Sequence, residues 1–313
     1  MKRPTPVLVG PTAVGKTAVA LALAAHWPME VVSADSRQIY RRLDVGTAKP
    51  TRRERARVPH HGLDLVEPGE RYSAGRFARD AAGWISDVRA RDRMPVVVGG
   101  TGLYVRALGE GLFLEPPLEP AARRALDAWL ARLPSGDLLR WAQRLDPGFA
   151  GGGRQRAARA VEIALLTGRA LGQWQHDARA AAAIRPWYVR LTVPRPVLHQ
   201  RIERRAEEML RRGLIEEVAA VLAEGHAPDA HGLDGVGIRE AVEYLHGRRT
   251  RESVPGAIAA ATRQYAKRQE TWFRHQLHGD VLGLDASGSP EEVAAAIAAA
   301  WAAFDRQPSP ADL

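Results

Sequence analysis

The chain has 313 residues, no cysteine and a formal net charge of +9 at pH 7. This length allows one large or two modest domains with a sizeable core, and the lack of cysteine excludes disulfides, thiolate catalysis and Cys-ligated zinc. The positive charge favours a polyanionic partner. No apolar stretch approaches the roughly 18 residues of a membrane span, and no signal-peptide core precedes the first strand, so we expect a soluble, cytoplasmic protein without membrane contact.

The first predicted elements are a strand, a glycine-rich loop and a helix. Thr5 to Val9 is a short apolar, β-branched run, and the pattern becomes helical and Ala/Leu-rich from Lys16 to His26. Between them, the phosphate-cradling motif G-x-x-x-x-G-K-[ST] is fitted by Gly10, Pro11, Thr12, Ala13, Val14, Gly15, Lys16 and Thr17. Strand, loop and helix in this order are the context that the motif requires.

The residue types of this loop suit a polyphosphate. Gly10 and Gly15 let backbone N–H groups turn toward an anion, and the following helix adds the positive end of its dipole. Lys16 can reach two phosphates, and the Thr17 hydroxyl can hold a magnesium ion. The loop therefore predicts binding of a diphosphate or triphosphate with Mg2+.

Two further strands reach the same edge of the predicted sheet. A strand over 30–33 delivers Asp35-Ser36-Arg37-Gln38, and a buried parallel strand over 95–98 ends in Gly99-Gly100-Thr101-Gly102. A helix lies within 72–91, and 46–70 is mostly loop or short helix because turn formers and charges dominate it. Ligands of open α/β sheets bind at this carboxyl edge.

The composition changes at Glu115-Pro116-Pro117, and the pattern stays helical to about Trp187, with helices over 121–133, 137–145 and 154–167. The later elements are a strand over 188–193, a helical stretch from Pro194 to Leu222, helices over 237–246 and 254–275, a strand near 280–284, and a helix from Pro290 with Ser289 as N-cap. We therefore expect an α/β fold: a P-loop NTPase-like parallel sheet flanked by helices, with an all-helical insertion domain and a helical C-terminal region. The expected divisions are a core over 1–114, the insertion over 115–187, core completion and basic helices over 188–306, and a disordered tail over 307–313.

Two classes of function are compatible with these residues. A nucleotide kinase or NTPase needs an acidic residue at the end of a hydrophobic strand to hold magnesium, but the strand over 95–98 ends in Gly-Gly-Thr. The acid at a strand end near the loop is Asp35, which would lie beside a bound diphosphate. The residues thus support transfer chemistry on a diphosphate, without showing which group moves.

The chain resembles the tRNA dimethylallyltransferases from about residue 5 to 285. The blocks that carry the resemblance, in the same order and spacing, are Gly10–Thr17, Ser33–Tyr40, Gly46–Pro50, Pro59–His61, Val98–Tyr104 and Thr262–Arg274. The resemblance implies a monomeric, Mg2+-dependent enzyme that moves a dimethylallyl group from dimethylallyl diphosphate to N6 of the adenosine 3′-adjacent to the anticodon in tRNA, releasing diphosphate. The alternatives are an adenylate isopentenyltransferase acting on free nucleotides and a P-loop nucleotide kinase.

The resemblance also implies roles for individual residues. Asp35 would accept the N–H proton of the amine, and Thr101 would bond the diphosphate's bridging oxygen or the base. Arg201 and Arg205, one helical turn apart, would lie near the diphosphate. The implied contacts with the tRNA anticodon stem-loop are Asp35, Ser36, Arg37, Gln38, Thr101, Arg123, Gln155, Arg156, Ala157, Ala158, Arg159, Arg263, Gln264, Lys267 and Arg268.

Each of these assignments has a structural alternative. Asp35 could be a helix N-cap and Thr101 a turn hydroxyl that satisfies the backbone, while the arginine pair could form a surface ion pair with Glu208. The basic blocks of the insertion and the C-terminal helix could be solvated faces. For the tandem His60-His61 we expect a structural or substrate-contacting role instead of a metal site, and for Trp272 a place in the core.

Overall fold

The structure is a computed structural model that describes residues 4–111, 118–177 and 181–305. Residue contacts divide the chain into two compact units. We call them the core unit, Met1–Gly109 with Ala183–Leu313, and the insertion unit, Glu110–Ala182. The predicted change of composition at 115–117 and the predicted tail over 307–313 lie outside the described residues.

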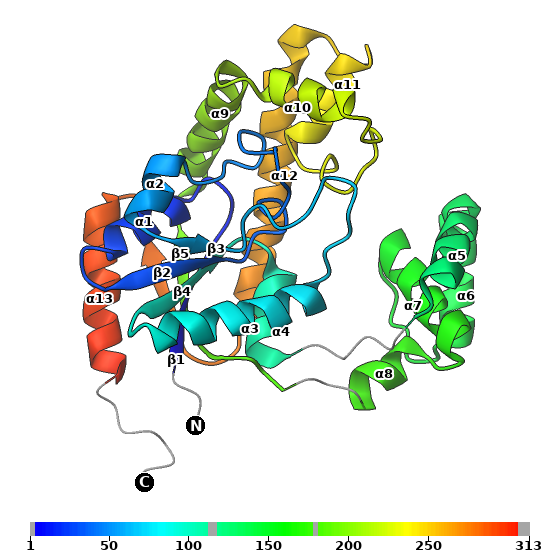
Figure 1. The fold of residues 1–313 in the computed structure, drawn as a ribbon, viewed down its shortest axis with the longest axis horizontal. Coiled ribbons are helices and arrows are strands. Elements are labelled where there is room, and N and C mark those ends of the chain that lie inside the picture. The colour runs from blue at the N-terminus through cyan, green and yellow to red at the C-terminus, as the bar shows by residue number, and fades with distance from the viewer. Residues whose placement is uncertain (1–3, 112–117, 178–180, 306–313) are drawn as a thin grey trace. The chain divides into compact units, whose positions relative to one another are not determined.

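A parallel sheet forms the centre of the core unit (Figure 1). In the described part of the chain it has six strands in the order β3-β2-β4-β1-β5-β6, with bounds β1 Pro4–Val9, β2 Met29–Ser33, β3 His60–His61, β4 Met94–Gly99, β5 Arg185–Thr192 and β6 Val281–Asp285. Val7 of β1 pairs with Val97 on one side and with Tyr188 on the other. The predicted parallel α/β sheet is confirmed. β1, β2 and β4 are buried along almost their whole length and are mainly apolar, with Thr5, Glu30 and Ser33 as buried polar residues.

Helices flank this sheet. Their bounds are α1 Lys16–Leu23, α2 Arg52–Arg57, α3 Ala74–Ala90, α4 Gly102–Glu110, α9 Arg195–Arg211, α10 Leu214–Ala223, α11 Ile238–Leu245, α12 Val254–His275 and α13 Pro290–Asp305. α3 packs on β2 and β4 through one apolar stripe that includes Phe77 and Ile85, and α1 packs on α13. None of the described helices has the length and apolarity that crossing a membrane requires.

Local sequence explains where several helices begin and end. The single helical stretch predicted from Pro194 to Leu222 is two helices, because Gly213 between them adopts a left-handed φ of 92°. α13 has the predicted N-cap: the Ser289 hydroxyl accepts from the Glu292 N–H at 3.3 Å, and the Glu292 carboxylate accepts from the Ser289 N–H at 2.9 Å.

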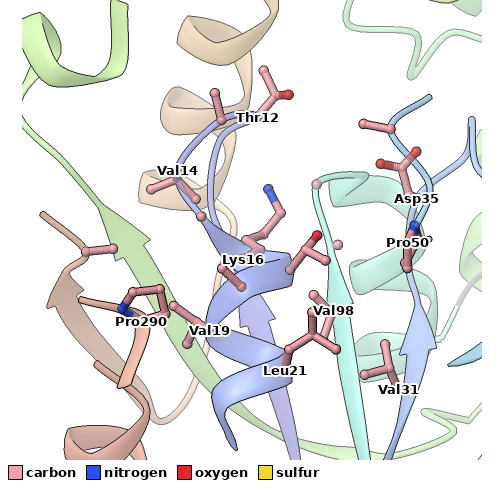
Figure 2. A pocket seen from close by; sticks show the side chains of 18 of the residues that line it. Thr12, Val14, Lys16, Val19, Leu21, Val31, Asp35, Pro50, Val98 and Pro290 are labelled. Carbon is pink, nitrogen blue, oxygen red and sulfur yellow. The ribbon is translucent and has the colours of Figure 1, made fainter. Parts of the chain in front are cut away.

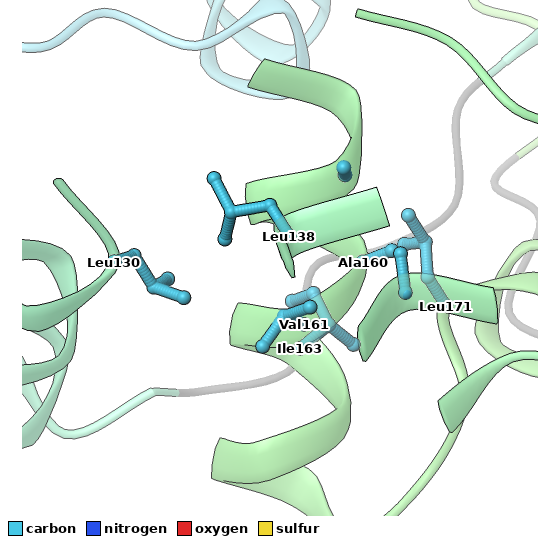
Figure 3. Packing of buried hydrophobic residues seen from close by; sticks show 8 residues of the cluster. Leu130, Leu138, Ala160, Val161, Ile163 and Leu171 are labelled. Carbon is cyan, nitrogen blue, oxygen red and sulfur yellow. The ribbon is translucent and has the colours of Figure 1, made fainter. Parts of the chain in front are cut away.

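The described residues of the insertion unit contain helices joined by loops, with bounds α5 Pro120–Arg132, α6 Ser135–Leu145, α7 Arg154–Thr167 and α8 Leu171–Asp177. Figure 3 shows their shared core, where Leu130, Leu138 and Ile163 meet. Each large side chain buried in this way stabilises a fold by about 1.5–3 kcal/mol. The unit therefore has an apolar core of its own.

Candidate active site

A pocket of ≈ 690 Å³ lies at the carboxyl edge of the sheet. Its lining includes Thr12, Ala13, Val14, Gly15, Lys16, Thr17, Asp35, Gln38, Gly99, Gly100, Arg201, Arg205, Tyr265 and Gln269. In Figure 2 the Lys16 side chain rises from the start of α1, and the Asp35 carboxylate comes from the segment after β2. Residues that are far apart in the sequence are thus brought together over the phosphate loop.

Backbone geometry fixes the shape of the loop. Gly10 has φ of 152°, and a Cβ there would lie 2.7 Å from the Leu191 carbonyl oxygen, so a larger residue would force the end of β1 away from β5. Gly15, with φ of 111°, also needs the freedom of glycine. The Lys16 ammonium donates to the carbonyl oxygens of Gly10 at 2.8 Å and Pro11 at 2.7 Å, which holds its charge inside the turn.

Two desolvated cations and a carboxylate face this pocket. Burial lowers the pKa of Lys16 to about 8; nearby Asp35 acts in the opposite direction, and Arg205 lowers the pKa further. Burial also lowers the pKa of Arg205, again opposed by Asp35. Charges in such a setting are poorly solvated by water and interact strongly with an anionic ligand.

The pKa of Lys16 predicts a pH dependence of anion binding. Below about pH 8 the ammonium is charged, so pyrophosphate affinity should hold there and should fall by about tenfold per pH unit above it. Calorimetric titration of pyrophosphate between pH 7 and 9.5 measures this fall in affinity. A guanidinium does not titrate in this range, so the affinity of Lys16→Arg, whatever its value, should not fall with pH in this way. Wild-type affinity that stays constant to pH 9.5 would contradict the assignment.

Arg201 and Arg205 of α9 both line the pocket. Arg201 reaches the loop itself, where Nη1 donates to the Val14 carbonyl at 2.9 Å and Nη2 donates to the Ala286 carbonyl at 3.1 Å. Arg205 lines the pocket one turn later. The structural alternative for these arginines was a surface ion pair with Glu208. Glu208 instead pairs with Arg211 at 2.6 Å, and within the described ranges no ion pair joins it to Arg201 or Arg205.

The segment after β2 is a turn and not a helix, so the N-cap alternative for Asp35 is wrong. The Asp35 carboxylate accepts from the Arg37 N–H at 2.8 Å and still lines the pocket. The Thr101 hydroxyl accepts from the Ser36 N–H at 2.9 Å. This contact fits the structural alternative for Thr101, a turn hydroxyl that bonds the backbone. Thr101 therefore ties the turn after β2 to the end of β4.

The remaining residues of this turn are held by loops of the core unit. The Gln38 amide donates to the carbonyl oxygens of Thr47 and Ala48 at 3.4 and 3.3 Å and accepts from the Ser33 hydroxyl at 2.9 Å. Arg37 donates to the His231 carbonyl at 2.8 Å. Arg37 also pairs with Asp234 at 3.7 Å, so more than one contact holds each side chain.

In the insertion unit, two of the predicted arginines share one buried carboxylate. Glu162 is 4% exposed and lies 2.7 Å from Nε of Arg123 and 2.5 Å from Nη1 of Arg159. Gln155 and Arg156 are exposed and Ala158 is half-buried. Ala157 is fully buried in the core of the unit, which corrects its prediction as a tRNA contact: its side chain can only pack.

The basic residues of α12 differ in their surroundings. Gln264, Lys267 and Arg268 are exposed, and the Arg268 guanidinium lies 5.7 Å from the centre of the Tyr265 ring. Arg263 pairs with Glu203 of α9 at 3.1 Å, so part of its charge is already compensated.

Trp272 and the tandem His60-His61, for which structural roles were considered, have contacts within the core unit. Trp272 packs against the start of α4, where a Cβ on Gly102 would lie 2.4 Å from the indole. His61 bonds Glu30 at 2.7 Å and stacks on Trp84, while His60 bonds the Val58 carbonyl at 2.6 Å. The residues that the structure describes hold no cluster of three His, Cys, Asp or Glu side chains suited to a metal ion.

Sequence reasoning missed two pocket residues on α12. Tyr265 lines the pocket, and burial, followed by nearby Asp35, raises its pKa to about 12. Gln269 is buried and bonds both the phosphate loop and the turn after β4. A spacing of four residues on the inward side of one helix was the signal that could have identified them together.

Two family profiles match the chain. The profile of the IPP transferase family matches residues 38–276, and that of isopentenyl transferase matches residues 5–59. Together they span the phosphate loop, all of α12 and most of the pocket lining.

Individual relatives are similar over nearly the whole length. A tRNA dimethylallyltransferase of Bordetella petrii is 44% identical over 297 residues, which cover 91% of this chain and 95% of the relative. One from Halorhodospira halophila is 44% identical over 286 residues, covering 89% and 92%.

Solved structures show the same similarity. A tRNA isopentenylpyrophosphate transferase of Bacillus halodurans has a TM-score of 0.71 and 33% identity, covering 97% of this chain and 96% of its own. A eukaryotic dimethylallyltransferase crystallised acting on tRNA has a TM-score of 0.80 and 25% identity, covering 98% and 81%.

Proposed function

The chain belongs to the tRNA dimethylallyltransferase family of IPP transferases, and on this premise we propose that its pocket binds dimethylallyl diphosphate and transfers the dimethylallyl group to N6 of the adenosine 3′-adjacent to the anticodon in tRNA. The observation that carries the proposal is the placement of Lys16, Arg205 and Asp35 around one pocket over the phosphate loop. A tRNA acceptor supports the cytoplasm as the place of action.

The chemistry requires a diphosphate to leave carbon and an amine to replace it. The C–O bond of the donor breaks as the N6–C bond forms, and the departing diphosphate gains charge. Lys16 and Arg205 are desolvated cations that stabilise this charge, and N–H groups of the loop can donate to it. The amine is a weak nucleophile because its lone pair is conjugated with the ring, and Asp35 takes the proton that the new bond releases.

The residues of the pocket fit a magnesium ion bound mainly by the donor. Thr17, in the first turn of α1, offers its hydroxyl at the pocket. Mg2+ commonly takes one or two protein ligands and completes its shell with phosphate oxygens and water. When bound there, the ion would offset the negative charge of the leaving diphosphate.

One assay separates this function from its alternatives. The protein is incubated with labelled dimethylallyl diphosphate and with tRNA, AMP or ATP. We expect label in tRNA alone. Label on AMP would support an adenylate isopentenyltransferase, and ATP hydrolysis or phosphate transfer without movement of label would support a nucleotide kinase or NTPase.

The exposed cations of α12 are expected to contact tRNA phosphates. Lys267→Ala should raise the tRNA KM and lower the slope of log K against log salt by about one unit, while donor affinity stays unchanged. The effect of Arg263→Ala should be smaller, because Glu203 already compensates part of its charge. Titrations at several salt concentrations measure both slopes. An unchanged slope for Lys267→Ala would show that this surface is a solvated face.

Glu162 is expected to hold Arg123 and Arg159 in the geometry that tRNA binding needs. Glu162→Gln keeps the side-chain volume but leaves two arginines without their buried carboxylate, so we expect the tRNA KM to rise about tenfold or more at unchanged donor KM. Asp137→Asn, which alters an exposed pair with Arg140 in the same unit, is the matched control. A tRNA KM within about twofold of wild type would contradict this role.

A further inference from the structure

The Gln269 side chain joins two separate parts of the pocket. It is 6% exposed, and both ends of its amide are used. Oε1 accepts from the Thr12 N–H at 2.8 Å, and Nε2 donates to the Gly100 carbonyl at 2.8 Å. These partners are 257 and 169 residues away in the sequence, one in the phosphate loop and one in the turn after β4.

The turn after β4 is shaped around this amide. A Cβ added to Gly100 would lie 2.3 Å from the Gln269 Nε2 and 3.7 Å from the Lys16 ammonium. Glycine at this position therefore leaves the space that the amide fills, beside the charged end of Lys16. One turn earlier on α12, Tyr265 also lines the pocket.

Only an amide satisfies both partners at once. Glutamate offers no donor to the Gly100 carbonyl, and methionine offers neither a donor nor a strong acceptor. Loss of the donor leaves the buried Gly100 carbonyl unsatisfied, and loss of the acceptor leaves the Thr12 N–H without this side-chain partner. The two partners would then be free to move apart.

We propose that Gln269 is a positioning residue that sets the donor against the acceptor. This inference rests on the proposed function. The phosphate loop carries the diphosphate, and the turn after β4 carries Thr101, which contacts the turn of Asp35 through Ser36. By holding Thr12 and Gly100 together, the amide fixes the separation of the carbon that reacts and the amine that attacks it. A misplacement of about 1 Å between reacting groups can cost about a hundredfold in rate.

The test compares Gln269→Met, Gln269→Glu and Gly100→Ala with wild type. In Gly100→Ala the glutamine is intact, but the added methyl group displaces its amide. We expect each variant to lower kcat by about 10- to 100-fold, with the tRNA KM within about twofold of wild type. Gln276→Met, at the C-terminal end of the same helix, should leave kcat unchanged and serves as control.

The outcomes separate the inference from the function on which it rests. If the wild type moves no label from dimethylallyl diphosphate to tRNA, the proposed function is wrong. If the wild type is active and Gln269→Met and Gly100→Ala both keep kcat within about threefold, only the positioning role is wrong. It is also wrong if the loss of kcat disappears at a temperature well below the melting point of each variant, because the role would then be stability alone.

Discussion

Asp35→Asn is expected to lower kcat by about 10²–10⁴-fold while donor affinity stays within a few fold of wild type. The asparagine oxygen can still accept from the Arg37 N–H, so the turn after β2 should persist. The amide cannot take a proton from the attacking amine, which removes the proposed base. Asp92→Asn changes a carboxylate outside the lining of the pocket and is the matched control.

The same variant has an electrostatic signature. Asp35 raises the pKa of Lys16 against the effect of burial. In Asp35→Asn the fall of pyrophosphate affinity with rising pH should therefore begin at lower pH. A role of Asp35 as base alone would not cause this change. Single-turnover rates and calorimetry measure the two effects separately. A variant that keeps more than about a tenth of kcat, a barrier change of only about 1.4 kcal/mol, would rule out the base role.

Lys16→Met is expected to weaken pyrophosphate binding by about 10²-fold or more at pH 7, with the tRNA KM unchanged. Removing one partner of a desolvated charge pair costs about 2–5 kcal/mol, and the Lys16 ammonium is such a partner when the diphosphate is bound. Lys16→Arg keeps the charge and should lose less. Calorimetry with pyrophosphate gives the constants, and a loss below about fivefold for the methionine variant would show that the loop N–H groups suffice.

The unliganded Lys16→Met protein should be more stable than wild type near neutral pH. The folded-state pKa of Lys16 is about 8, below the ordinary value of 10.5, so folding disfavours the charged form. This cost is complete below about pH 8 and disappears as pH rises through 10.5. Thermal unfolding between pH 6.5 and 10.5 should show a melting temperature gain for the variant that shrinks with pH. A variant less stable than wild type throughout would contradict this sign.

Features encoded within short segments could be predicted from the sequence. The loop from Gly10 to Thr17 lies between an apolar strand and an Ala-rich helix, and parallel strands bring their carboxyl ends to one edge. This rule alone predicts that Asp35 lies beside the phosphate loop. The all-helical insertion could also be predicted, because the sequence pattern there stays helical and contains no strand signal.

Long-range contacts could not be read from local patterns. Gln269 meets Thr12 only once α12 is packed within the folded core unit, so the sequence around either residue does not predict the bond. Hydrophobic periodicity also did not predict the break between α9 and α10 at Gly213, because apolar residues continue on both sides of this glycine. Ala157 directly follows the exposed Arg156 in sequence but lies on the inward side of α7, a distinction that depends on helical phase alone.

The order of strands in the sheet has a consequence for synthesis of the protein. β1 lies between β4 and β5, so it leaves the ribosome long before its second partner has been made. Its open edge must stay unpaired while the whole insertion unit is translated, an interval in which exposed strand edges invite aggregation and chaperone binding. Since Gln269 reaches the phosphate loop from α12, a nascent chain cannot assemble the complete donor site until α12 has emerged.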